Sequence, residues 1–485
     1  MKRLTPYKLN PEKGRPLAFF KQQTVTTAAL SVALAASALA VTGKAHAGGF
    51  ALIEIGASGL GNAYAGASAV SADTSTVWFN PAGMLHLAPR EFAAAAHVIS
   101  TDSTFNNRGT SLSSLVGGAA VSGPETDDIG QATAVPNLFY VHRVSDDIAL
   151  GFGLTVPFGS STEYDDDWVG RYSASESGVA VFDFNPTIAY RVNDKVKLGG
   201  GISLQYMDAT LSSIIDSGAS CLGLAGASNS PLSQADCINA GLVPGNQATD
   251  SFSEVQGDSV EFTFNVSALI EPQEGTRFGI AYRHGVDHTI EGDADFQLNP
   301  VLEQVVQSAG LPLFVDGGAQ AGADLPPTVM FSVAHQASSR LQLLADATWT
   351  GWSSLEELRV TFDNPAQPDA PTPLNWKNVW RVSVGANFQL NDTWTLRGGL
   401  AFDEEAIRNS NFRSPRIPGN DRHWISFGAG YKLSDSISFD FGLSQLFLND
   451  TAINNNVLDA AGGSTVRGFY EQSVTIAAAQ LNWKF

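Results

Sequence analysis

The chain has few charged residues, and basic ones are the scarcest. Asp, Glu, Lys and Arg make up 16% of its 485 residues, and 28 Lys and Arg stand against 48 Asp and Glu, which leaves a formal net charge of −20. This balance argues against a nucleic-acid partner, because neutralising phosphate groups requires a basic surface. Only two cysteines are present, so a cysteine-rich zinc site is excluded and at most one disulfide can form.

Catalytic signatures are also missing from the sequence. Neither the G-x-S-x-G turn of serine hydrolases nor the H-E-x-x-H helix of zinc proteases occurs. A lipase is the enzyme class that this absence argues against most directly. We expect no enzymatic activity, no cofactor and no metal site.

Long hydrophobic runs are confined to the N-terminus. Residues 1–47 carry seven basic residues and one acid, followed by an apolar stretch from about Val25 to Val41 that leads to Ala45-His46-Ala47. This order is typical of a secretory signal peptide cleaved after Ala47, with a membrane anchor as the alternative. No later stretch is apolar for the ~18 residues that a spanning helix needs. The exported chain is therefore soluble, or it crosses a membrane as a closed β-barrel.

Apolar and polar residues alternate in many later segments, for example over 380–388 and 437–443, which predicts β-strands. A soluble sandwich shows the same alternation, so the connections are the better evidence. Six short turns alternate with seven long connections, and one rim of tight turns opposite one rim of long loops is typical of outer-membrane barrels. We therefore predict an all-β fold, a 14-stranded antiparallel transmembrane β-barrel over 91–485. The predicted strands lie near 91–101, 135–143, 147–157, 178–191, 195–210, 258–271, 276–287, 327–336, 340–360, 376–389, 393–403, 422–432, 436–448 and 469–485.

Residues 48–90 fit neither a strand nor a linker. They combine a Gly-rich run, 57–66, with many large apolar side chains such as Ile55, Trp78 and Phe79, too many to leave in water. The lumen of a 14-stranded barrel is too wide for wall side chains alone to fill. We expect these residues to form an N-terminal hatch, a plug inside the barrel.

Several short motifs follow one another in a characteristic order along the chain: Gly49-Phe50, Ser58-Gly59-Leu60-Gly61, Ala63-Tyr64-Ala65-Gly66, Asn80-Pro81-Ala82, Asp167-Trp168-Val169-Gly170-Arg171-Tyr172, Trp380-Arg381 and Asp421-Arg422-His423-Trp424. With these motifs, the whole mature length resembles the FadL family of outer-membrane long-chain fatty acid transporters. The resemblance implies a 14-stranded barrel with an N-terminal hatch and uptake of hydrophobic molecules without ATP, in some relatives aromatic hydrocarbons.

The resemblance also implies roles for individual residues. It implies a role for Phe50 in an internal hydrophobic site and for a basic residue of the tenth strand, here Lys377 or Arg381, with Arg171 as a further candidate for binding a carboxylate. Arg381 falls on the polar, inward side of the alternation over 380–388, and Lys377 has the same parity.

Local sequence adds two structural expectations to this set. In Asn80-Pro81-Ala82 the proline fixes a turn and extends Asn80, whose amide can hold backbone groups, so we interpret the motif as a hatch lock. Cys221 and Cys237 share one long loop of an exported chain, which favours a disulfide.

A weak seam is expected between the third and fourth strands. Gly151, Gly153, Pro157 and Pro186 lie there, and glycine weakens a ladder while proline cannot donate to one. The resemblance implies an inward kink of the third strand at this place, which opens a gap in the wall. A simple bulge without functional consequence is the alternative for Pro186.

The sequence thus favours a multi-pass bacterial outer-membrane protein that takes up long-chain fatty acids by passive, hatch-gated lateral diffusion. Uptake of aromatic or alkane hydrocarbons and a non-specific porin are the alternatives. The expected partners are a hydrophobic small molecule, outer-membrane lipid and lipopolysaccharide, and the barrel assembly machinery that reads a C-terminal aromatic such as Phe485. A monomer is expected.

Overall fold

The computed structural model describes residues 49–126, 129–130, 132–227, 230–459 and 462–485. The signal peptide predicted over 1–47 lies outside these residues. None of the helices in the described part of the chain has the length and apolarity that crossing a membrane as a helix requires.

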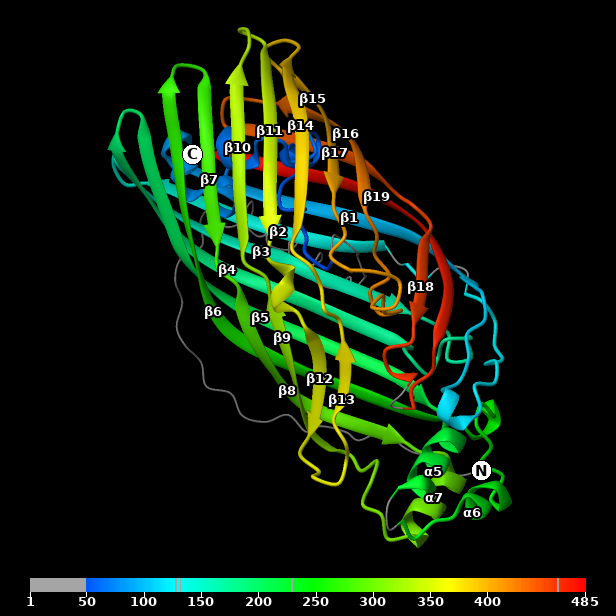
Figure 1. The fold of residues 1–485 in the computed structure, drawn as a ribbon. Coiled ribbons are helices and arrows are strands. Elements are labelled where there is room, and N and C mark those ends of the chain that lie inside the picture. Colours follow the sequence, from blue (N-terminus) through cyan, green and yellow to red (C-terminus); the bar gives the residue numbers. More distant parts are fainter. Residues whose placement is uncertain (1–48, 127–128, 131, 228–229, 460–461) are drawn as a thin grey trace, which may run out of the picture. The chain divides into compact units, whose positions relative to one another are not determined.

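Most of the described chain is a single antiparallel sheet that closes on itself, because β19 pairs with β1 (Figure 1). Five strands of the wall are broken into two pieces each: β7 and β8, β9 and β10, β11 and β12, β13 and β14, and β17 and β18. With each broken strand counted once, the barrel has 14 strands, which confirms the predicted fold. The strands are β1 (Arg90–Asn107), β2 (Ala132–Arg143), β3 (Ile148–Glu163), β4 (Glu176–Asn193), β5 (Val196–Ile215), β6 (Ser251–Gln273), β7 (Thr276–Arg283), β8 (Val286–Gln297), β9 (Gly317–Leu325), β10 (Thr328–Gln336), β11 (Leu341–Thr350), β12 (Glu357–Phe362), β13 (Ala370–Pro373), β14 (Val379–Gln389), β15 (Trp394–Asp403), β16 (Arg422–Lys432), β17 (Ile437–Leu448), β18 (Thr451–Asn455) and β19 (Val466–Lys484).

Several strands run further than the sequence pattern indicated. The stretch 288–326, expected to be a long loop, contains most of β8 and all of β9, with α7 (Pro300–Ser308) between them. Charged residues such as Asp287, Glu291 and Asp293 face outward on β8. The prediction was wrong there because a strand that continues beyond the membrane needs no apolar outer face, so its sequence resembles a loop.

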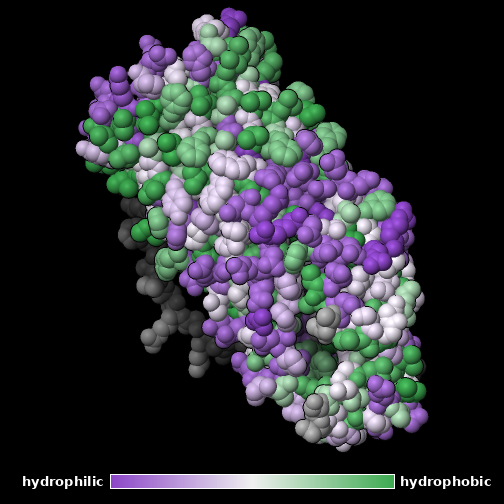
Figure 2. Space-filling model, viewed as in Figure 1, coloured by the Kyte–Doolittle hydropathy of each residue, from purple (hydrophilic) through white to green (hydrophobic). Residues whose placement is uncertain are grey.

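The outer face of the wall carries an apolar band near the rim of tight turns. Figure 2 shows hydrophobic surface gathered over β7, β10 and β11 at that end, with a more hydrophilic surface towards the long loops. A protein in water would not leave so many large apolar side chains exposed, whereas a lipid-facing wall requires them. Outward residues more than two-fifths exposed include Phe152, Ile188, Ile202, Phe262, Val266, Ile280, Phe331, Leu343, Trp380, Val384, Leu400, Phe427, Phe441 and Leu443.

Residues 49–89 form a chain of short helical turns that pack against the inner side of the wall: α2 (Ala57–Leu60), α3 (Ala67–Val70), α4 (Thr76–Phe79) and η1 (Pro81–His86). Wall glycines make this close contact possible. A Cβ atom on Gly199 would lie 2.3 Å from the Ala82 nitrogen, and one on Gly428 would lie 2.6 Å from the Gly61 Cα. Small residues of the wall therefore lie against small residues of the hatch, and the hatch occupies the part of the lumen that the wall side chains do not fill.

The long loops beyond β5, β6, β8 and β9 fold into a small helical cluster. It contains α5 (Ser217–Gly226), α6 (Gln234–Asn239) and α7, which are drawn together at the long-loop end in Figure 1. Cys221 and Cys237 form the expected disulfide and lie in a shared apolar core with Leu242, Leu302 and Val306.

Candidate functional site

The N-terminal segment Phe50–Ile53 lies between two cavities of the lumen. Its backbone pairs with β3: the Leu52 nitrogen donates to the Pro157 oxygen at 2.7 Å, and the Gly159 nitrogen donates to the Phe50 oxygen at 2.9 Å. Ala51 and Phe158 are the partners of the resulting β-bridge. The first described residues are thus held as a short strand against the wall.

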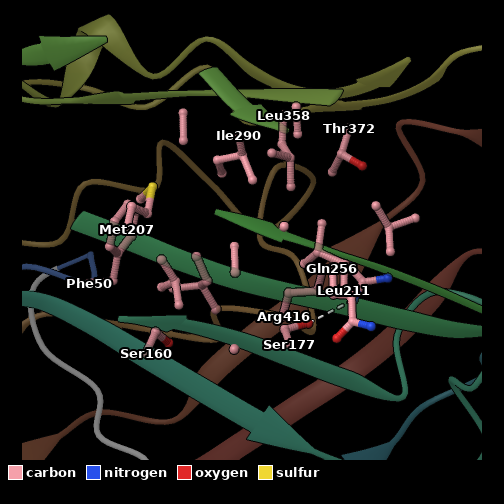
Figure 3. A pocket seen from close by; sticks show the side chains of 18 of the residues that line it. Phe50, Ser160, Ser177, Met207, Leu211, Gln256, Ile290, Leu358, Thr372 and Arg416 are labelled. Atoms are coloured by element: carbon pink, nitrogen blue, oxygen red, sulfur yellow. Dashed lines mark hydrogen bonds between the residues drawn. The ribbon is translucent and has the colours of Figure 1, made fainter. Parts of the chain in front are cut away.

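The outer cavity, on the side of the long loops, has a volume of about 110 Å³ and an almost wholly apolar lining. Figure 3 shows Phe50 beside Met207 on its wall, with Ile290 and Leu358 among the other lining residues. Phe50 is 5% exposed, and burying apolar surface of this kind is worth about 25 cal/mol per Å² to a hydrophobic ligand. An alkyl chain or an aromatic ring fits this chemistry, and a polar solute does not.

Aromatic rings hold Phe50 in place. Its ring centroid lies 5.0 Å from that of Trp352, 5.8 Å from that of Phe158 and 6.0 Å from that of Trp376. Both tryptophans come from breaks in the wall, since Trp352 follows β11 and Trp376 precedes β14. Gly49 passes directly beneath them: its φ is +63°, and a Cβ there would lie 2.7 Å from the Trp352 ring, so only glycine fits.

The inner cavity, also about 110 Å³, lies on the hatch side of the segment and is more polar. Arg381, predicted to face inward, lines it and is 6% exposed. One Nη2 hydrogen bond goes to the Ala63 oxygen at 2.9 Å, and the guanidinium lies 5.0 Å from the Trp424 ring, whereas Nε and Nη1 have no hydrogen-bond partner among the described residues. A residue that lines a cavity with two unpartnered donors can bind a carboxylate there.

The other two predicted basic residues have partners of their own. Lys377 Nζ lies 2.6 Å from a carboxylate oxygen of Glu404. Arg171 is buried in the loops, where Nε lies 2.9 Å from Asp250 and further donors reach the Ser122 and Trp168 oxygens. Neither side chain lines the outer or the inner cavity.

The predicted interruption between β3 and β4 was misplaced. These strands pair from Ile148 to Glu163 with one irregularity between Thr155 and Phe158, at Pro157. The pairing that stops is the one between β2 and β3, which is confined to the six residues Ala149–Leu154 of β3. Beyond Leu154 the edge of β3 is left by β2 and is taken by the N-terminal segment.

A polar side chain spans this gap between β2 and β3. Asn137 of β2 accepts a hydrogen bond from the Val156 nitrogen at 3.3 Å and donates to the Glu54 oxygen at 3.0 Å. It therefore joins β2, the irregular part of β3 and the hatch where the β2–β3 pairs are missing.

Pro186, also predicted to weaken the β3–β4 pairing, interrupts the pairing between β4 and β5 instead. Pro186 pairs with Phe152 of β3, and the pairs missing beside it are those with β5, since Asn185 and Pro186 have no ladder partner there. The Asn185 side chain donates to the Ile202 oxygen at 3.1 Å instead.

Gly151 and Gly153 allow the hatch to approach β3. A Cβ on Gly151 would lie 2.4 Å from the Met84 sulfur, and one on Gly153 would lie 3.3 Å from Val77. Their local role in this structure is contact with the hatch.

Asn80 of the Asn80-Pro81-Ala82 motif is buried and fully engaged. Its amide nitrogen donates to the Ser68 oxygen at 2.7 Å and to the Ala268 oxygen of β6 at 3.0 Å, and its Oδ1 accepts from the Ala82 nitrogen at 3.1 Å. The side chain links two turns of the hatch to the wall.

Several residues of the site escaped the sequence analysis. They lie in segments without a motif of their own, and they are Asn137, Trp352, Trp376 and Arg416, which follows β15 and lines the outer cavity. Arg283, which stacks on Trp78 at 3.4 Å and lines the inner cavity, could have been found as a charge on an inward position of the predicted seventh strand. Among the described residues no group of acidic, histidine or cysteine side chains could hold a metal ion.

A closed 14-stranded wall with an apolar outer band, plugged by its own N-terminal segment, defines an outer-membrane barrel of the plugged type. The sequence model of the outer membrane protein transport family (OMPP1/FadL/TodX) matches residues 38–485, and the chain belongs to this family. It is therefore an outer-membrane protein, as predicted.

Relatives and solved structures agree with this assignment. The chain is 28% identical over 428 residues to the long-chain fatty acid transport protein of Escherichia coli O6:H1, covering 87% of this chain and 91% of that protein. It is 29% identical over 430 residues to outer membrane protein P1 of Haemophilus influenzae, covering 85% and 89%. The structure of a Pseudomonas aeruginosa FadL homologue matches with a TM-score of 0.79 and 25% identity, covering 90% of this chain and all of the other. The Pseudomonas putida toluene transporter TodX shares the fold at a TM-score of 0.65 and 16% identity, covering 90% and 99%.

Proposed function

We propose that the protein takes up long-chain fatty acids, or hydrophobic molecules of similar shape, across the outer membrane by passive diffusion. The observation that carries this proposal is the apolar outer cavity, closed at its inner end by Phe50 and the N-terminal segment. A relative of similar length is a long-chain fatty acid transport protein, which supports the substrate class. Uptake of hydrocarbons is the alternative, since the lining of the cavity is suited to them as well.

Substrate would leave sideways through the gap between β2 and β3. The N-terminal segment occupies the edge of β3 that β2 leaves, so the same residues close both the cavity and the gap. Thermal motion that detaches Phe50–Leu52 would open both at once. An apolar molecule gains nothing by crossing an aqueous space, and a lateral path delivers it to the lipid.

A non-specific porin is the weaker alternative. A pore for polar solutes needs an open lumen, and here the hatch is packed against the wall at wall glycines such as Gly199 and Gly428. No enzymatic activity enters the proposed mechanism.

The proposal also assigns a role to each segment of the chain and names the partners of the barrel. Residues 1–47 would be removed on export, 48–90 would serve as the hatch, and 91–485 would form the barrel. The C-terminal Phe485 would be read by the barrel assembly machinery, and lipid and lipopolysaccharide would surround the apolar band. Pairing of β19 with β1 leaves no sheet edge of the wall for a second copy, which favours a monomer.

The test is uptake in a strain that lacks its own transporter of this kind. Cells expressing the protein should accumulate labelled palmitate at least tenfold faster than cells with an empty vector, and should not take up a polar solute of similar mass. Faster entry of the polar solute would overturn the proposal in favour of a porin. Preferential entry of hexadecane or toluene would replace fatty acid by hydrocarbon as the substrate.

A further inference from the structure

Arg416 is the one charged side chain among the described residues that line the outer cavity. It belongs to the inward loop, residues 404–421, which connects β15 to β16 and crosses to the opposite wall. There the Arg416 oxygen accepts a hydrogen bond from Thr162 at 3.2 Å, and Tyr164 donates to the Pro415 oxygen at 2.7 Å. The loop thus brings one guanidinium to a place that otherwise offers only apolar and neutral surface (Figure 3).

The partners of Arg416 are all neutral. Its Nη1 donates to the Glu176 backbone oxygen at 2.9 Å and to Ser177 Oγ at 2.7 Å, and its Nη2 donates to the Ser212 oxygen at 3.0 Å. Within the described residues, no carboxylate oxygen forms an ion pair with it, whereas the nearby Arg413 of the same loop lies 2.5 Å from Glu405. A guanidinium carries five N–H groups, so this one retains donors for a ligand.

The charge of Arg416 persists at neutral pH. Burial lowers the pKa of its guanidinium to about 10, which is still well above the pH of the medium. Arg416 is partly buried, and a partly buried cation without a counter-ion is unfavourable, so an incoming anion would relieve that cost. The chemistry that matches a planar donor fork is a carboxylate, bound by two parallel hydrogen bonds.

We propose that Arg416 binds the carboxylate of the transported amphiphile in the outer cavity, with the alkyl chain lying along the apolar wall towards Phe50. This inference rests on the proposed function and sharpens it, because a neutral hydrocarbon cannot use Arg416. The substrate class is then a single-chain carboxylic acid. The outer cavity would orient it head towards the inward loop and tail towards the N-terminal segment.

The experiment compares an acid and an alcohol of equal chain length, dodecanoate and dodecan-1-ol, for binding to the full-length protein in a non-ionic detergent. We expect the wild type to bind the acid about tenfold or more tightly than the alcohol, as charge-assisted hydrogen bonds imply. Arg416→Met should bring this ratio close to one by weakening the acid alone. The matched control is Arg408→Met, an exposed arginine of the same loop that lines neither cavity.

The acid-to-alcohol ratio separates head-group binding from a structural role, because a displaced loop would weaken both ligands alike. A wild-type ratio in Arg416→Met overturns the inference, as does a wild-type protein that binds both ligands equally. If Arg416→Met binds neither ligand, the comparison is made with Arg416→Gln, which can still donate to Ser177. An acid-to-alcohol ratio equal to that of the wild type in Arg416→Gln then overturns the inference. A wild-type protein that binds neither ligand instead counts against the proposed function itself.

Discussion

The Leu52 nitrogen donates to the Pro157 oxygen at 2.7 Å, and this hydrogen bond joins the N-terminal segment to the irregular part of β3. Pro157 has no N–H of its own, and β2 has already left this edge. The bond therefore lies where the β2–β3 pairing has ended and where the segment that lines the cavity begins. The contact between Leu52 and Pro157 thus holds the segment that bounds the cavity and covers the edge of β3 that β2 leaves.

Tethering this contact should stop transport. Ala51 and Phe158 are bridge partners in a non-hydrogen-bonded pair, whose Cα atoms lie about 4.5 Å apart, within the range of a disulfide. In the double variant Ala51→Cys, Phe158→Cys, oxidation should reduce uptake at least tenfold, and reduction should restore it. Labelled fatty acid uptake into cells measures both states.

The control is a disulfide between Ile148→Cys and Tyr190→Cys, a pair of the β3–β4 ladder that lines neither cavity. It should leave uptake unchanged, and wild-type cells treated with the same reductant show any effect of opening the native disulfide. Transport at the wild-type rate in the oxidised Ala51–Phe158 variant would place the exit elsewhere, through a displaced hatch.

Replacing Phe50 by Ala should weaken ligand retention. The ring lines the outer cavity and packs on Trp352, so its loss removes apolar contact worth about 2 kcal/mol, or roughly thirtyfold in affinity at most. Phe50→Leu keeps most of the volume and should bind nearly as well as the wild type. Tryptophan fluorescence titration of the purified variants measures the affinity, and heat-modifiable migration on gels checks barrel assembly. Equal affinity in Phe50→Ala would argue against the placement of the ligand beside this ring.

Replacing Asn80 by Ala should loosen the hatch. The change leaves the Ser68 and Ala268 oxygens without the donor that they share, at a cost of about 1–3 kcal/mol per buried group. Because the hatch fills the lumen, a looser hatch should admit ions, so the conductance of the variant in planar bilayers should rise several-fold. Asn420→Ala, in the inward loop and outside the hatch, serves as the control. Unchanged conductance in Asn80→Ala would remove the motif from the role of a hatch lock.

Removing the disulfide should affect the helical loop cluster and spare the barrel. Cys221 and Cys237 close a loop of 16 residues in sequence separation, for which the stabilisation is on the order of 3 kcal/mol. In the double Cys→Ser variant we expect proteolytic cleavage between α5 and β6 to become faster, with the gel mobility of the folded barrel retained. Loss of the folded barrel would show that the cluster is needed for assembly.

Much of the fold was predictable because it depends on periodicity and on the lengths of connections. Lipid outside and a filled lumen inside impose a two-residue alternation, and the sorting of short turns and long loops reports the two rims. The same logic placed Arg381 in the lumen. It failed for 288–326, where β8 and β9 run beyond the membrane and the outward residues are polar.

Three features follow directly from the order of the amino acids: the barrel, the apolar N-terminal segment that must be buried, and a proline in β3 that cannot donate to a ladder. Which neighbouring strand stops pairing with β3 depends on the folded chain, because the missing N–H of Pro157 does not determine whether the β2 side or the β4 side opens. The tertiary structure also decided that Trp352 and Trp376 meet Phe50 and that Arg416 crosses to the far wall. These contacts join residues hundreds of positions apart, and no local pattern encodes a meeting that depends on how the whole wall closes around the hatch.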